Sequence, residues 1–227
     1  MLCLSLFVLL ASHPTAETTP KEALKAFNDL IGSWKATGTP EGNREDKQRG
    51  FWTETLTWEW QFRGKDSWLK FDADKGKHFM GGELRYLPSE DKYQLTARTP
   101  AKTDEIYTGE LKGRTLSLDR TDDKTGDVHR VVIKLLHSNR YLYRYEVKAK
   151  GRTLFARRYE VGATKEGEPF AAGGNAAPVC IVSGGLGTIR VAYKGREFFV
   201  CCSGCKTAFD EDPEKFIKEF EMKNKGK

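Results

Sequence analysis

The chain has 227 residues, of which 31% are charged, and its formal net charge is +6. This proportion of charge excludes a predominantly membrane-embedded protein, and the length allows one medium domain with one small one. The positive charges are spread along the chain and form no basic run, so nucleic acid is not an expected partner. Composition leaves the oligomeric state open.

An apolar run from Leu2 to Ala11 opens the chain. It is too short to span a bilayer, but it matches the core of a signal peptide that is cleaved near Ala16. We therefore expect residues 1–16 to be a removable leader, and the mature protein to be secreted or periplasmic with no integral membrane segment. Cys3 lies in this leader, so the mature chain keeps the other four of the five cysteines.

Residues 17–161 are predicted to form an antiparallel β-barrel. A short helix comes first, with Thr19 as its N-cap, Pro20 in its first turn and Gly32 at its end. After Gly32 the hydrophobic period becomes that of strands. The expected strands begin near Trp34 and at residues 55–62, 68–71, 78–87, 92–98, 105–111, 115–120, 128–136, 141–148 and 153–161. Short turns and no helical crossovers indicate a meander, which loses its exposed edges by closing into a barrel.

The leading helix, the Gly32-Ser33-Trp34 triplet and the up-and-down strands resemble the lipocalin and fatty-acid-binding-like superfamily over residues 24–161. A barrel of this size either holds a small apolar ligand or is filled by its own side chains. The aromatic residues that would line such a cavity, or form an ordinary core, are Trp58, Trp60, Phe62, Tyr141, Tyr143 and Tyr145.

The barrel region carries no recognisable catalytic or metal-binding motif. His78, His129 and His137 have no second histidine or cysteine at ligand spacing, so we assign them no role. No nucleotide-binding loop or nucleophile motif is present, and we therefore expect that the protein is not an enzyme.

Residues 162–176 are rich in Gly and Ala and poor in apolar side chains, which predicts a flexible linker between tethered modules. Residues 177–227 are predicted to form a small α+β module. Its expected elements are two strands, 190–193 and 197–200, around the turn at Lys194-Gly195, and a helix that starts after Asp212.

Four cysteines of this module are the predicted metal ligands: Cys180, Cys201, Cys202 and Cys205. Thiolates are soft ligands that suit zinc, copper(I) or iron–sulfur iron. Cys201 and Cys205 form a C-x3-C pair, Cys202 and Cys205 a C-x2-C pair, and Ser203-Gly204 supply the small residues that either knuckle needs. We expect the thiols to converge on one heavy-metal ion, zinc or copper(I).

The segments PVC, YKGREFFVCCSGC and DPEKF, between Ala177 and Phe220, resemble the YHS/TRASH class of small cysteine-containing domains. Those domains are similar to treble-clef metal binders, and the resemblance implies heavy-metal binding or sensing. It places Cys180, Cys201 and Cys205 on the family's metal-binding cysteines. Where many relatives have a second cysteine soon after the first, this chain has Ser183 or glycine, and Cys202 is the obvious substitute.

The function expected from these features is that of an exported protein that buffers, delivers or senses a soft metal. One alternative is a small apolar-ligand carrier with a structural metal knuckle, and another is a redox-active dithiol at Cys201-Cys202 or Cys202-Cys205. A disulfide pair and a purely structural metal also fit four cysteines. A catalytic thiol fits worst, because the module has no histidine to act as its base.

Overall fold

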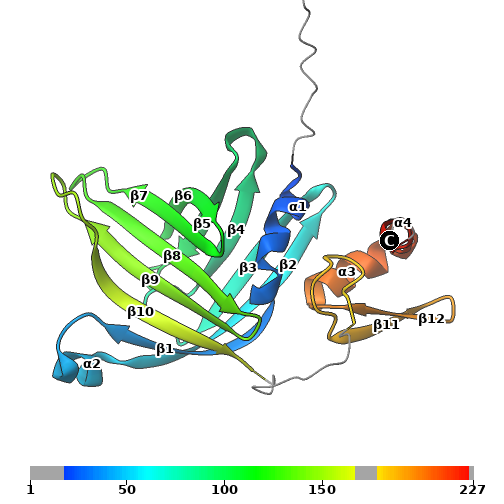
Figure 1. Ribbon diagram of the computed structural model, residues 1–227, viewed down its shortest axis with the longest axis horizontal. Helices are drawn as coiled ribbons and strands as arrows, with labels where there is room; N and C mark the ends of the chain where they lie inside the picture. Colours follow the sequence, from blue (N-terminus) through cyan, green and yellow to red (C-terminus); the bar gives the residue numbers. More distant parts are fainter. Residues whose placement is uncertain (1–17, 167–177, 225–227) are drawn as a thin grey trace, which may run out of the picture.

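The computed structural model describes residues 18–166 and 178–224 of the chain. It confirms the predicted fold class, because a closed antiparallel β-barrel is followed by a small α+β unit with its own two-stranded sheet (Figure 1). The predicted leader and residues 167–176 of the predicted linker lie outside the described residues. Within the described ranges, no helix combines the length and the apolar character that crossing a membrane requires.

The barrel is an up-and-down meander in which each strand pairs with its neighbours in the chain, and the last strand closes on the first. Its strands are β1 (Gly32–Pro40), β2 (Trp52–Arg63), β3 (Asp66–Asp74), β4 (Gly81–Leu87), β5 (Lys92–Arg98), β6 (Asp104–Lys112), β7 (Thr115–Thr121), β8 (Val128–His137), β9 (Arg140–Lys148) and β10 (Ala156–Lys165). Tight turns join most of them, and Gly64 and Gly113 supply the positive φ angles that two of these turns need. A 3₁₀ turn, η2 (Pro88–Glu90), joins β4 to β5.

Two predicted boundaries in the barrel are wrong. β10 does not end at Val161 but continues to Lys165, and Thr164 pairs with Lys35 on β1. The first small residues of the predicted linker, Gly162 and Ala163, are part of the barrel wall, where Ala163 is fully buried. The strand expected from His78 begins only at Gly81, because residues 75–80 form the connection from β3.

A helix between β1 and β2 was not predicted. α2 (Arg44–Gly50) buries none of its residues and has no apolar stripe, so hydrophobic periodicity gave no sign of it. A capping box starts it, since the Asn43 side chain accepts from the Asp46 amide and the Asp46 carboxylate accepts from the Asn43 amide.

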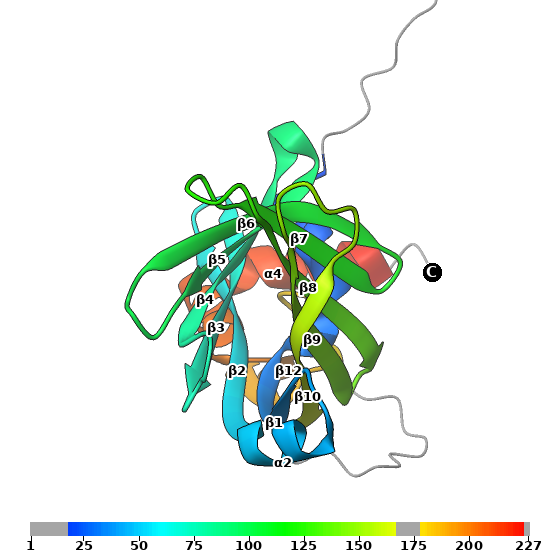
Figure 2. The ribbon, with the colours of Figure 1, turned by 90° about the vertical axis from the view of Figure 1, so that its left-hand side faces the viewer.

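The leading helix covers one end of the barrel. The predicted N-cap is confirmed, because Thr19 Oγ1 accepts from the amide of Glu22 at the start of α1 (Pro20–Leu24). The 3₁₀ helix η1 (Lys25–Leu30) follows, and together these helices bury Leu24, Phe27 and Leu30 completely. Seen from the other end of the barrel, they lie behind the ring of strands (Figure 2).

The C-terminal unit packs directly against the barrel, so the prediction of two merely tethered modules is wrong. The buried side chains of the two parts form one hydrophobic cluster. Helix α3 (Ser203–Glu211) lies on β2, where Ser203 Oγ donates to Glu59 Oε1 at 2.9 Å. Helix α4 (Pro213–Asn224) reaches back to α1 through an ion pair of 3.4 Å between Lys21 and Glu219.

Gly204 makes the closest approach between the two parts. A Cβ atom at this position would lie 1.6 Å from the backbone oxygen of Trp60, which a helix packed on a strand cannot accommodate without moving. We expect Gly204→Ala to lower the free energy of unfolding by about 1–3 kcal/mol, as overpacking does. Urea denaturation of the full chain measures this. Gly162→Ala is the matched control, because its nearest contact is an ordinary 3.5 Å; equal stability of the two variants would contradict the tight docking.

The centre of the barrel is filled by side chains. Of the six aromatic residues singled out in the sequence, Trp58, Trp60, Tyr141 and Tyr143 are buried, and Trp58 Nε1 donates to the Tyr141 hydroxyl at 3.2 Å. The cavity that remains among them and their apolar neighbours has a volume of about 30 Å³. Pockets for small molecules are typically about 300–1,000 Å³, so this cavity is small by comparison.

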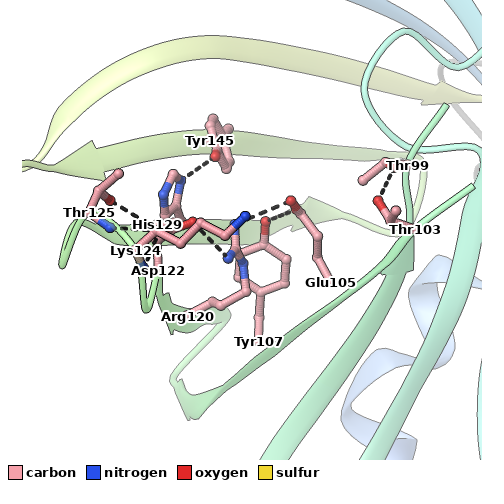
Figure 3. Close-up of polar contacts among 10 residues, drawn as sticks. All are labelled: Thr99, Thr103, Glu105, Tyr107, Arg120, Asp122, Lys124, Thr125, His129 and Tyr145. Atoms are coloured by element: carbon pink, nitrogen blue, oxygen red, sulfur yellow. Dashed lines mark hydrogen bonds and ion pairs between the residues drawn. The ribbon is translucent and has the colours of Figure 1, made fainter. Parts of the chain in front are cut away.

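The barrel end opposite α1 is polar and aromatic inside. Figure 3 shows side chains from β6 to β9 directed at one another there. Glu105 accepts from the Tyr107 hydroxyl and from Arg120, and His129 bonds to the Tyr145 hydroxyl. These pairs satisfy most of the polar groups named here, although Arg120 Nε is buried without a hydrogen-bond partner in the described part of the chain.

His78 belongs to the same end, and its titration links stability to pH. The ring stacks on Tyr159 with 3.9 Å between ring centres, and burial, with a smaller effect of the Lys77 charge, lowers the pKa of His78 from 6.5 to about 4. Between these values the unfolded chain binds a proton that the folded chain excludes, so the free energy of unfolding falls as pH drops through this window. His78→Phe keeps a stacking ring but cannot titrate. Its urea midpoint should therefore decline less between pH 7 and pH 4.5 than that of the unchanged protein, and parallel declines would contradict the assignment.

Candidate metal centre

A β-hairpin brings two of the cysteines to the centre. The predicted strands are confirmed as β11 (Ile189–Tyr193) and β12 (Arg196–Val200), which pair in antiparallel register. Lys194 and Gly195 both have positive φ, 48° and 75°, as a tight two-residue hairpin turn requires. Val200 is fully buried at the end of β12, and Cys201 and Cys202 follow it into the interior.

A loop tied to this hairpin positions the distant cysteine. Cys180 forms a bridge with Phe199, and the amide of Ile181 donates to the Phe199 carbonyl at 2.8 Å. The chain then turns sharply, so that the Ser183 amide donates to Cys180 Sγ at 3.4 Å. This turn places Ser183 directly beside the sulfur of Cys180.

The fourth cysteine comes from α3, whose start was not predicted. Cys202 is the N-cap residue of this helix and Cys205 lies in its first turn. The predicted knuckle residues Ser203 and Gly204 are therefore helical. The N-terminus of a helix presents free amides and partial positive charge, which favours thiolate over thiol. The predicted helix after Asp212 is confirmed as α4, where Phe216 is buried in the core.

The structure brings three of the predicted ligands into one cluster. The sulfur atoms of Cys180, Cys201 and Cys205 all lie within 4.8 Å of one another, and the last two are 3.4 Å apart. A tetrahedral metal with bonds of about 2.3 Å to sulfur places its ligand atoms roughly 3.8 Å apart, so small movements would close this group on an ion. All four cysteines are buried and free of disulfides. Among the described residues, no other group of three such side chains has this geometry.

Cys202 lies beside this group and not within it. Its sulfur is 3.8 Å from Cys201 Sγ, but it also accepts a hydrogen bond of 3.4 Å from the backbone amide of Trp60 on β2. The Ser183 hydroxyl lies 3.4 Å from Cys201 Sγ and is fully buried. Three thiols thus form the centre of the cluster, and a fourth thiol and a hydroxyl lie beside them.

The proton affinities of the thiols diverge because the sulfurs bond to one another. Hydrogen bonds from the neighbouring thiols lower the pKa of Cys180 to about 2 and that of Cys202 to about 3. The bond to Cys180 raises the pKa of Cys201, while burial is the main cause that raises the pKa of Cys205. The cluster therefore mixes thiolates with thiols, and a metal that binds all its sulfurs releases protons.

A surface cavity lies beside the cluster. A cavity of about 400 Å³ between α1, α4 and residues 179–184 has Cys180 in its wall. Lys21, Lys25 and Lys223 contribute to its rim, together with Glu219 and Phe220.

Some residues of the site gave no signal in the sequence. Trp60 was considered only as a possible cavity or core residue, yet its amide bonds to Cys202, and its indole Nε1 donates to Asn28 Oδ1 at 3.0 Å. Asn28 in turn donates to the carbonyl of Ser183 at 3.3 Å. The histidines at positions 78, 129 and 137 take no part in the cysteine cluster.

Comparison with known proteins adds no family to this description: the chain matches no protein-family model, and no curated protein shows significant similarity to it.

The geometry ranks the cysteines. We expect Cys180→Ser, Cys201→Ser and Cys205→Ser each to lower metal affinity by at least about tenfold, since each removes a soft ligand from the central group. Cys202→Ser should cost much less for an ion that takes three thiolates. Competition titration of each variant against a chelator of known affinity gives the ranking. Unchanged affinity in Cys180→Ser would remove the site, and equal losses at positions 201 and 202 for copper(I) would overturn the order.

Proposed function

We propose that this protein binds a soft heavy-metal ion, copper(I) or zinc, in the cysteine cluster of its C-terminal unit, and that it buffers, delivers or senses that ion. The observation that carries the proposal is the convergence of three buried thiol sulfurs within 4.8 Å of one another from separate parts of the chain. Buried polar groups without strong partners are costly, and a metal ion is the partner that a group of thiolates fits best.

The donor set favours a soft ion. Sulfur is the only ligand atom in the central group, and the nearby oxygen is a neutral hydroxyl on Ser183. Magnesium and calcium require oxygen ligands, whereas thiolates select copper(I), zinc or iron–sulfur iron. The resemblance of this segment to YHS/TRASH domains supports the same ion class.

Binding, and not catalysis, is the role we propose for the thiols. Their hydrogen-bond partners in the described part of the chain are other thiols, a hydroxyl and backbone amides, with no histidine to act as a base. A dithiol that cycles through a disulfide would compete with metal for the same sulfurs. The apolar start of the chain further supports a role outside the cytoplasm, where a bound metal would protect the thiols from oxidation.

Elemental analysis of the purified, untagged full-length protein tests the proposal. We expect a stoichiometric soft metal in the protein and none in the double variant Cys180→Ser/Cys205→Ser, which retains Cys201 and Cys202. Metal binding stabilises the folded state by mass action, so a chelator should also lower the melting temperature of the unchanged protein alone. Equal metal content in both proteins, or no metal after anaerobic reconstitution, would refute the proposed function.

A further inference from the structure

Strand β2 has an edge that its neighbour β1 does not cover. The pairing of these strands begins at Gly38 with Trp52 and ends at Gly32 with Trp58, whereas β2 continues to Arg63. On this extension the backbone groups that would face β1 need other partners, because an unpaired buried amide is costly. The C-terminal unit lies beside this end of β2 (Figure 1).

The start of α3 replaces the missing strand at Trp60. Cys202 Sγ accepts the Trp60 amide proton at 3.4 Å, and Gly204 packs directly on the Trp60 carbonyl. Although Cys202 is the N-cap residue, its side chain makes no capping bond to its own helix. The sulfur thus contacts the barrel at Trp60 as well as the neighbouring thiol of Cys201.

A second contact ties the other half of the cysteine cluster to the same tryptophan. Asn28 lies between them, since its Oδ1 accepts from the Trp60 indole and its Nδ2 donates to the carbonyl of Ser183. Asn28 also lies close to Gly185, where a Cβ atom would be 3.0 Å from its side chain. Cys202 thus contacts Trp60 directly, and the loop after Cys180 contacts it through Asn28.

The position of Cys202 permits two ways of holding a metal. An ion that takes three thiolates can bind between Cys180, Cys201 and Cys205 while Cys202 stays on the Trp60 amide. A tetrahedral ion with four thiolates requires Cys202 to approach Cys180, since it lies outside the group whose sulfurs are all within 4.8 Å. That movement takes the sulfur away from Trp60.

We infer that Cys202 determines how many thiolates the metal receives. Its hydrogen bond with the Trp60 amide keeps it out of the three-thiolate group until an ion recruits it. This inference rests on the metal-binding function proposed above. Copper(I) occupies the three-thiolate group and leaves the barrel contact intact. Zinc, which prefers four ligands in tetrahedral geometry, recruits Cys202 and frees the Trp60 amide. The hydrogen bonding of the Trp60 amide in β2 then differs between the copper(I) and zinc forms.

Two titrations and one spectrum on the full-length, reduced protein test this. Copper(I) and zinc affinities are measured by chelator competition for the unchanged protein, for Cys202→Ser and for the control Ser203→Ala. The control removes the neighbouring contact to Glu59 but no sulfur. The backbone amide of Trp60 is followed in nitrogen–proton correlation spectra of the metal-free, copper(I) and zinc forms, and circular dichroism shows whether each variant is folded.

Cys202→Ser should leave copper(I) affinity nearly unchanged and lower zinc affinity by at least about tenfold. Even the loss of a residue that only supports a ligand costs about that much, and here a ligand itself is lost. Ser203→Ala should change neither. The Trp60 amide resonance should stay in place with copper(I) and shift with zinc. Parallel losses of both affinities in Cys202→Ser, or a Trp60 amide that responds identically to both ions, would overturn the inference while the metal-binding function stands. Failure of the unchanged protein to bind either ion would refute the proposed function itself.

Discussion

The backbone of Trp60, at the uncovered edge of β2, is the point on which both parts of the molecule depend. A buried amide without a partner costs about 1–3 kcal/mol, and here the partner is the sulfur of Cys202. Without the C-terminal unit, this amide and the carbonyl next to Gly204 would be an open sheet edge. Without the barrel, Cys202 and the loop at Ser183 would lose the hydrogen bonds that hold them to Trp60 and Asn28. The contact therefore positions the metal ligands and completes the barrel wall together.

The C-terminal unit is small, and this explains why it depends on outside support. Its own core consists mainly of Val191, Phe198, Phe209 and Phe216 around the thiols. A unit of this size buries too little apolar surface to be stable by packing alone. Two supports are available, a metal among the thiols and the barrel surface at β2. Both act on the same segment, Cys201 to Cys205, so a metal that recruits Cys202 would also alter the contact with the barrel.

The barrel was largely predictable because its signals are local. Alternation along β2 and the glycine turns at positions 64 and 113 act within a few residues, and so does the turn at Gly195. Helix α2 was not predicted because it buries none of its residues. The start of α3 was not predicted because Ser203 and Gly204 are poor helix formers. Spacing also indicated the four cysteines as ligands, whereas the choice of Cys180, Cys201 and Cys205 came from the resemblance to YHS/TRASH domains.

What the sequence could not reveal are contacts between distant segments. The Trp60 amide and Cys202 are separated by 142 positions, and Asn28 and Ser183 by 155. A backbone donor carries no sequence signature, since every residue other than proline has one. Which donor remains unpaired is decided by where β1 begins, and that is a property of the closed barrel. The role of Cys202 thus follows only from the register of two strands far from it in the chain.

The two ends of the barrel differ in chemistry, and this separates what each can contribute. The end with Glu105, Arg120 and His129 has polar groups that bond to one another, apart from Arg120 Nε, which has no partner among the described residues, and the centre is nearly filled. The opposite end is sealed by η1 and carries the cysteine cluster against β2. The barrel therefore contributes a backbone edge, at Trp60, to the candidate metal centre. That edge suits this purpose, because a sulfur bonded to a strand amide has a defined resting position.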